Sequence, residues 1–181
     1  EIFKFNLVDP DNRRSVDYSY PMSLLRKIQP ALNFDPKIND LSIFNDLLMP
    51  FESGALKLFY TSATHNIRHK NSDLFRLGKY IPLEVTGEKA ENIVSFARLY
   101  NNQAIISVVP VMFSTLASLD NPLQLKKEIL GNTRIILPEE LNNFRWMDIY
   151  TKENKKIKNN KILVADILNT LPASILYGKR T

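Results

Sequence analysis

The sequence predicts an α+β chain in which a mostly helical part, residues 1–77, precedes an all-β part, residues 78–181. Two observations predict this division. Before Gly78, apolar residues recur at three- and four-residue spacing, which is typical of amphipathic helices. After Gly78 they alternate with polar residues or form short runs between turn residues, which is typical of strands in an antiparallel β-sandwich.

The N-terminal stretch combines an apolar strand end, residues 2–8, with a rigid polar turn. Pro fixes φ, and Asp and Asn side chains bond the turn backbone. Polar loops that follow buried strands carry the binding groups of α/β barrels. The candidate binding residues of this loop are Asp9, Asp11, Arg13 and Arg14. An alternative stays open, in which these charges form an internal salt-bridge network that shapes the loop.

Two short helices are predicted next. Residues 21–28 place apolar side chains on one face, and Pro30 is expected to end this helix. Residues 40–49 form the second helix, with Asn39 or Asp40 as its N-cap and its end before a proline.

The best helical pattern runs from residue 53 or 54 to about residue 70. Its apolar stripe consists of Leu56, Phe59, Tyr60, Ala63 and Ile67. His65, Arg68 and His69 fall off the stripe, so we expect them to face solvent. The four-residue spacing of the two histidines suits a metal pair, but no third ligand lies near them, so no metal site is predicted.

A β-hairpin is predicted from residues 93–100 and 103–111, joined by Asn101-Asn102, which tolerates positive φ. The run 103–109 is apolar on both faces, so it should be a central strand. We expect three of its side chains to be buried: Ile105, Val108 and Val109.

The remaining strands are shorter. Residues 120–130 form either a short helix or a long loop, capped by Asp120 or Asn121 and closed by Gly131. Further strands are predicted at 79–85, 133–137, 145–150, 161–164 and 173–177. The only Trp, Trp146, is expected in the core, although a sugar-stacking platform is the alternative.

Charge and composition exclude several classes. The net charge is +5, and the dense basic run consists of Lys152, Lys155, Lys156, Lys158 and Lys161. Because no aromatic residue interleaves this run to stack a base, we expect a solvated hairpin loop and no nucleic-acid partner. The absence of cysteine excludes disulfides and thiolate metal sites. No apolar run approaches the ~20 residues of a membrane span, so a cytoplasmic protein without a membrane partner is expected.

Residues 8–18, VDPDNRRSVDY, resemble the VDPDNRRPVDY segment of the maltooligosyl trehalose synthases, which belong to the α-amylase family, glycoside hydrolase family 13. Further matching strings follow in the same order at 54–58, 73–75, 78–85, 96–98, 131–134, 146–148 and 171–173. Ser15 stands where the family usually has Pro, and Asn132 where it usually has Asp.

The resemblance implies that residues 1–77 close a catalytic (β/α)8 barrel and that residues 78–181 form the antiparallel β-sandwich that follows it. It implies an isomerase that converts the reducing-end α-1,4 bond of a maltooligosaccharide into an α,α-1,1 bond, with no metal or organic cofactor. The family's catalytic carboxylates precede this segment, so none is expected in this chain, and they lie upstream of Glu1. The implied partners are the α-glucan substrate and the N-terminal remainder of the barrel.

An alternative from another class is a stand-alone β-sandwich module that binds glucans without catalysis. Such modules usually show several exposed aromatic residues on one face. Here Trp146 stands alone among strands whose aromatic residues are expected to be buried. Since Glu1 is not Met and the chain opens within a strand, we expect the C-terminal piece of a longer protein.

Overall fold

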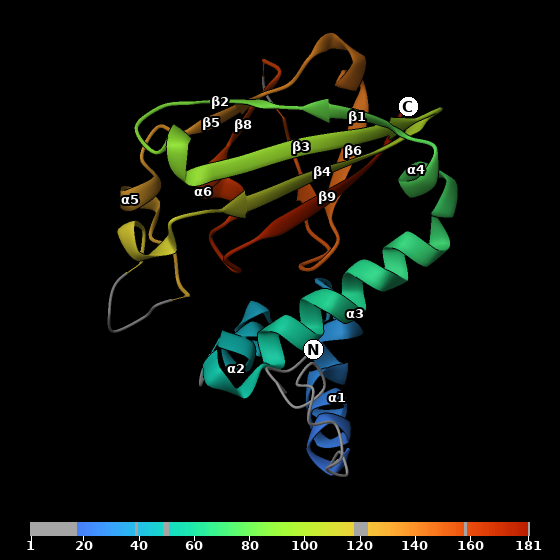
Figure 1. Ribbon diagram of the computed structural model, residues 1–181, viewed down its shortest axis with the longest axis vertical. Coiled ribbons are helices and arrows are strands. Elements are labelled where there is room, and N and C mark those ends of the chain that lie inside the picture. Colours follow the sequence, from blue (N-terminus) through green and yellow to red (C-terminus); the bar gives the residue numbers. More distant parts are fainter. Residues whose placement is uncertain (1–17, 39, 49–50, 118–122, 158, 181) are drawn as a thin grey trace, which may run out of the picture. The chain divides into compact units, whose positions relative to one another are not determined.

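The computed structural model describes residues 18–38, 40–48, 51–117, 123–157 and 159–180 (Figure 1). The chain forms two compact units, Glu1–His65 and Asn66–Thr181. Both the helical and the β part of the expected α+β chain are present. None of the helices in the described segments is long and apolar enough to cross a membrane.

The first unit is helical. Its elements are α1 (Ser19–Leu32), η2 (Leu41–Phe44), α2 (Asn45–Leu48), η3 (Phe51–Ser53) and the first part of α3 (Ala55–Lys70). Three aromatic rings form its centre, because the ring of Phe44 lies 5.0 Å from that of Phe34 and 5.9 Å from that of Phe59. All three side chains are buried, and Phe44 is fully so.

The prediction that Pro30 ends the first helix is wrong, because Pro30 lies inside α1, which continues to Leu32. Pro lacks an N–H, so the carbonyl of Arg26 loses its helical donor. Arg26 is exposed, and solvent can bond that carbonyl instead. The helix then ends with Asn33 N–H donating to the Gln29 carbonyl at 3.0 Å.

Two further predictions for the helical part of the chain are confirmed. Asp40 is the N-cap of η2, and its Oδ1 accepts a hydrogen bond from Ser42 N–H at 3.1 Å. On α3, Leu56 and Phe59 are buried. His65, Arg68 and His69 are exposed, as predicted.

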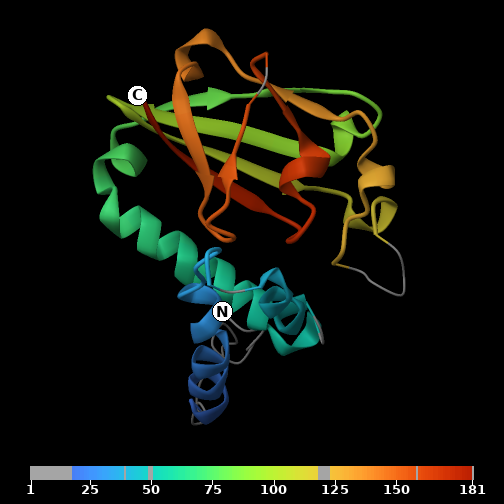
Figure 2. The ribbon, with the colours of Figure 1, turned by 180° about the vertical axis from the view of Figure 1, so that it is seen from behind.

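The second unit contains two antiparallel sheets, which Figures 1 and 2 show from opposite sides. The six-stranded sheet has the order β1 (Lys79–Pro82), β3 (Ile93–Tyr100), β4 (Gln103–Pro110), β9 (Ser174–Arg180), β6 (Phe144–Asp148) and β7 (Asn154–Lys155). The three-stranded sheet has the order β2 (Glu84–Thr86), β5 (Arg134–Ile136) and β8 (Lys161–Leu163). The connecting helices are α4 (Ser72–Arg76), η4 (Ala90–Asn92), η5 (Phe113–Thr115), α5 (Lys127–Leu130), η6 (Glu139–Leu141) and α6 (Val164–Ile167).

One hydrophobic core joins the two sheets of this unit. Ala97, Ile106 and Leu176 come from the six-stranded sheet, and Ile135 and Ile162 come from the three-stranded sheet. Each of these side chains is at most 5% exposed. Removing this apolar surface from water is the main stabilising contribution to a two-layered β-structure.

The predicted hairpin is confirmed as β3 and β4, and Asn101 has a φ of 52° in the turn. Strand β4 is central, since it pairs with β3 on one side and β9 on the other. Ile105 and Val108 are buried as predicted, but Val109 is 44% exposed. Val109 follows the inward-facing Val108, so the alternation of a strand turns it away from the shared core.

The segment between β4 and β5 contains a helix of only four residues, α5, which Gly131 ends with a φ of 53°. The closing role of Gly131 is therefore confirmed. Asp120 and Asn121, the predicted caps, lie outside the described residues. Asn132, one of the two departures from the family string, places its Oδ1 3.1 Å from Glu88 N–H and accepts its hydrogen bond.

Candidate functional site

The binding residues predicted from the sequence, Asp9, Asp11, Arg13 and Arg14, all lie outside the residues that the structure describes. The same is true of the predicted strand end at residues 2–8. Their role therefore stays a prediction.

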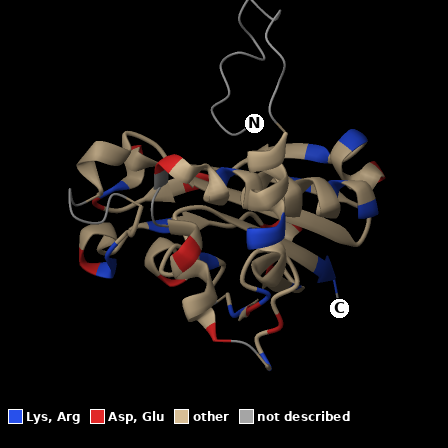
Figure 3. Ribbon diagram, turned by 90° about the horizontal axis from the view of Figure 1, so that it is seen from below, with Lys and Arg blue, Asp and Glu red and all other residues tan. Residues whose placement is uncertain are grey.

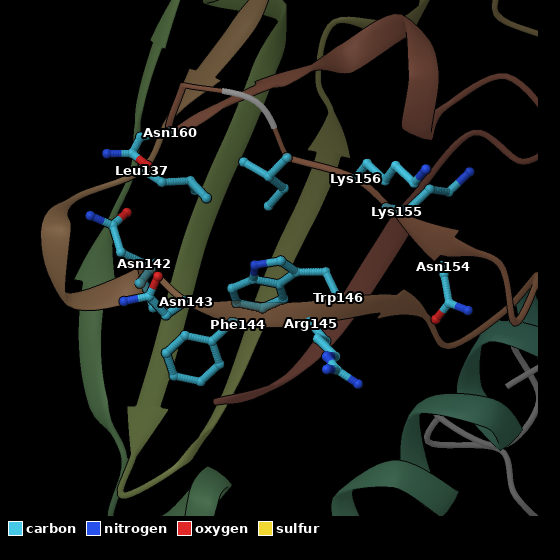
Figure 4. A pocket seen from close by; sticks show the side chains of 12 residues that line it. Leu137, Asn142, Asn143, Phe144, Arg145, Trp146, Asn154, Lys155, Lys156 and Asn160 are labelled. Carbon is cyan, nitrogen blue, oxygen red and sulfur yellow. The ribbon is translucent and has the colours of Figure 1, made fainter. Parts of the chain in front are cut away.

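Within the second unit, a pocket of about 850 Å³ opens beside β6 and β7 (Figure 4). Its lining comes from the end of β5, the turn before β6, both strands of the β6–β7 pair and the loop that leads to β8. Pockets of about 300–1,000 Å³ are the usual size for small-molecule sites. This pocket is a candidate site in the described part of the chain.

Two stacked rings form a wall of the pocket. The ring of Phe144 lies 5.3 Å from that of Trp146 at an interplanar angle of 29°. Trp146 pairs with Gly178, and a Cβ atom at Gly178 would lie 2.7 Å from the indole ring. Arg180 places its guanidinium 4.9 Å from the centre of the Phe144 ring. Trp146 is only 3% exposed, which confirms the core prediction and leaves little of the ring available as a stacking platform.

Amide side chains dominate the polar lining of the pocket. Asn142 and Asn143 form the turn before β6, and Asn143 has a φ of 63°. Figure 4 shows these two near one end of the Trp146 ring, with Asn154 beyond the other. The Oδ1 atom of Asn142 is buried and accepts no hydrogen bond from any residue that the structure describes. An unsatisfied buried acceptor costs roughly 1–3 kcal/mol, so this atom marks a position where a donor would be favourable.

The basic run matches the solvated hairpin loop that the sequence predicted only in part. Lys155 is only 14% exposed at its side chain, and its Nζ lies 2.7 Å from Glu153 Oε2. Lys152 is half-buried and donates to the carbonyl of Ile149. The sequence shows how many charges the run carries, but it does not show which groups these lysines contact. Lys156 and Lys161 are exposed as expected, and Lys158 lies outside the described residues.

Charges of both signs are interspersed along the ribbon in Figure 3. Burial lowers the pKa of Lys152, and the nearby carboxylate of Asp148 opposes this change. A half-buried lysine of this kind is held by its local hydrogen bond and is poorly placed to contact nucleic acid.

Asp148 is a buried carboxylate at the end of β6, with 2% of its surface exposed. Its Oδ1 accepts from Tyr150 N–H at 2.8 Å and Thr151 N–H at 3.0 Å, and its Oδ2 accepts from Ser174 Oγ at 2.5 Å. Burial raises the pKa of Asp148, while the bond from Ser174 and the two backbone bonds oppose the rise. This carboxylate holds the turn after β6 against β9.

Sequence analysis missed both Asn142 and Asp148. A local signal existed for each, since two asparagines precede the aromatic strand and an acid ends it directly before a turn. The burial of Asp148 depends on β9, which is distant in the sequence, and that information is not local.

The fold and the pocket define an α+β chain whose second unit is an antiparallel β-structure with an amide-lined pocket beside β6 and β7. No family model and no curated protein matches the sequence. A solved structure shares the fold: a mutant of maltooligosyltrehalose synthase from Arthrobacter ramosus superposes with a TM-score of 0.62 at 22% sequence identity. The superposition covers 94% of this chain and 18% of that chain, so this chain spans less than a fifth of that enzyme.

Proposed function

We propose that this chain is the C-terminal part of an intramolecular transglucosylase of the maltooligosyl trehalose synthase type. The observation that supports it most is the shared fold over 94% of the chain with a maltooligosyltrehalose synthase. The strings that resemble the same family in the sequence point in the same direction. The intact enzyme is a cytoplasmic isomerase of the α-amylase family in this proposal.

The proposed reaction breaks the reducing-end α-1,4 bond of a maltooligosaccharide. One carboxylate forms a covalent bond to the maltooligosyl C1 while a second, roughly 5–5.5 Å away, donates a proton to the leaving glucose. The freed glucose turns in place, and its anomeric hydroxyl attacks that C1, gives its proton to the second carboxylate and displaces the first carboxylate, which forms the α,α-1,1 bond. Water must be excluded, because water attack would yield hydrolysis instead. Both carboxylates belong to the part of the protein before Glu1.

This chain would contribute to substrate positioning. In the proposal, residues 1–77 close the catalytic barrel and the loop after its last strand lies at the barrel mouth. Asp9 and Asp11 accept hydrogen bonds from sugar hydroxyls, while Arg13 and Arg14 donate them. The sandwich follows the barrel, and the reaction needs no cofactor.

The isolated chain should convert no maltopentaose, because the carboxylates that cleave the α-1,4 bond are absent from it. The measurement is the loss of reducing ends together with NMR detection of α,α-1,1-linked product. Product formed by purified residues 1–181 would show that the catalytic residues lie inside this chain, and the assignment of its role would then be wrong.

In the longer protein, Arg13→Ala or Arg14→Ala should lower kcat/KM by about 10- to 150-fold, the loss expected for a charge-assisted hydrogen bond of about 1.5–3 kcal/mol. The melting temperature should change little. Arg76→Ala is a matched control, since Arg76 is exposed and pairs with Asp73 on the surface of α4. Wild-type kcat/KM in both variants would exclude sugar contact, and a lower melting temperature with lower activity would assign a loop-shaping role.

A further inference from the structure

A groove of about 480 Å³ lies on the outer face of the six-stranded sheet, where β6 and β9 run side by side. On β6 the side chain of Trp146 faces the core, so the residues on either side of it face outward. On β9 the same holds for the residues that flank Gly178, which pairs with Trp146. The groove is lined by Arg145, Met147, Tyr177, Lys179 and Arg180.

Two cross-strand pairs divide the groove into a charged half and an apolar half. Arg145 lies opposite Lys179 in the strand register, and Met147 lies opposite Tyr177. Residues directly opposite each other in antiparallel strands have Cβ atoms about 4.5–5.5 Å apart. The guanidinium of Arg145 and the ammonium of Lys179 can therefore reach the same ligand group.

The charged half lacks a counter-ion within the protein. Arg145 and Lys179 are exposed, and neither forms an ion pair with any carboxylate in the part of the chain that the structure describes. By contrast, Lys79 on the same sheet is paired with Glu140 at 2.7 Å. Like charges that lie directly opposite each other destabilise a sheet. An anion held between the two side chains would replace this repulsion with attraction.

Arg180 adds positive charge to the groove, but its guanidinium is already engaged. Its Nη2 donates to the carbonyl of Glu140 at 2.7 Å, and the group lies 4.9 Å from the centre of the Phe144 ring. Arg145 and Lys179 are therefore the groups that contact the ligand, and Arg180 strengthens the local field.

The apolar half is held in place before any ligand arrives. The hydroxyl of Tyr177 donates to Asn71 Oδ1 at 3.0 Å, which fixes the ring. The Nζ atom of Lys179 lies 6.0 Å from the centre of the same ring. Tyr177 and Met147 are half-buried, so part of each side chain stays accessible. A tyrosine ring and a thioether suit a flat apolar group, and a preformed site loses little entropy on binding.

The charge of the groove selects among anions. A carboxylate carries one negative charge and would neutralise only one cation of the pair. A phosphate monoester carries about 1.5–2 negative charges at neutral pH. Its oxygens match the planar donor fork of arginine and leave a further oxygen for the lysine.

We propose that this groove binds a phosphate monoester that bears a flat apolar group. The phosphate lies between Arg145 and Lys179, and the flat group packs on Tyr177 and Met147. This inference goes beyond the proposed transglucosylase, since it assigns an anionic ligand to the outer face of the sheet and needs no catalytic residue.

Isothermal titration of the 181-residue chain with phenyl phosphate tests the proposal. Saturable binding at one site is expected, and it should weaken as NaCl is added. Inorganic phosphate lacks the ring and benzoate lacks the second charge, so each should bind at least about tenfold more weakly. Titration with AMP separates two sources of the same chemistry. Tighter binding of AMP would assign a nucleotide, and tighter binding of phenyl phosphate would assign an aryl phosphate.

Variants of the charged half test the contacts. Arg145→Gln and Lys179→Gln should each weaken the binding of phenyl phosphate about tenfold or more, the loss expected for a charge-assisted hydrogen bond. The melting temperature should not fall, because either change removes the repulsion. Arg134→Gln on β5 and Lys161→Gln on β8 are matched controls, since both residues are exposed strand residues outside the groove. Both controls should bind as the wild type does.

Variants of Tyr177 test the apolar half. Tyr177→Leu removes the ring and should abolish the preference for phenyl phosphate over inorganic phosphate. Tyr177→Phe removes only the hydroxyl that bonds Asn71 and should retain that preference. The phosphate contact should remain in both variants, so inorganic phosphate should bind them as it binds the wild type.

Four results would overturn the inference. They are the absence of saturable binding of phenyl phosphate, equal binding of phenyl phosphate and inorganic phosphate, undiminished affinity in folded Arg145→Gln and Lys179→Gln, and an equal loss of affinity in the two controls. The last result would show attraction by net charge alone. None of them would affect the proposed transglucosylase, whose test is the activity of the longer protein.

Discussion

Replacing Asp148 with Ala should lower the free energy of unfolding by about 3–5 kcal/mol. The substitution removes the acceptor of three hydrogen bonds at once and leaves the donors Tyr150 N–H, Thr151 N–H and Ser174 Oγ buried without their partner. Urea unfolding followed by Trp146 fluorescence measures the change close to the site. In the Asp148→Ala variant, the turn after β6 should lose its protection from hydrogen exchange before the other parts of the second unit do.

Asp166 offers a matched control for this experiment. Its side chain is 64% exposed, and it lies 3.9 Å from Lys127 in a surface ion pair. Asp166→Ala should therefore change the free energy of unfolding by no more than about 0.5 kcal/mol. Equal effects of the two substitutions would show that burial of Asp148 contributes nothing to the stability of the turn.

Phe44→Ala should lower the free energy of unfolding of the first unit by about 3–5 kcal/mol, because the substitution leaves a cavity at the centre of an aromatic cluster. Phe44 is 0% exposed and contacts the rings of Phe34 and Phe59. Thermal unfolding followed by far-UV circular dichroism reports on the helices of this unit. Ile38→Ala is the control, since Ile38 is 82% exposed. A wild-type melting profile for Phe44→Ala would contradict the cluster as the core of the unit.

The elements that local pattern alone determines could be predicted from the sequence. The β3–β4 hairpin follows from two apolar runs around Asn101, and the stripe of α3 follows from its helical spacing. Pro30 shows the limit of such rules, since a proline near the end of a helix removes one bond without ending it. Val109 shows another limit, because the last residue of an apolar run can face solvent when its strand alternates.

The candidate site was less predictable than the fold. The pocket brings together segments that lie up to about twenty residues apart, from Leu137 to Asn160, around a strand pair. Whether Asn142 is satisfied depends on every group that surrounds it, and a single sequence does not contain that information. For the loop that contains Asp9 and Arg13, the sequence patterns supplied a hypothesis about binding. That loop lies outside the residues that the structure describes.

We propose that this chain belongs to an enzyme that forms α,α-1,1 linkages. The most direct measurement uses a longer protein that contains these 181 residues after a catalytic barrel, incubated with maltopentaose. NMR should show the reducing-end anomeric signals disappear while an α,α-1,1-linked anomeric signal appears, with little free glucose. Release of glucose and shorter maltooligosaccharides without any α,α-1,1 signal would contradict the claim.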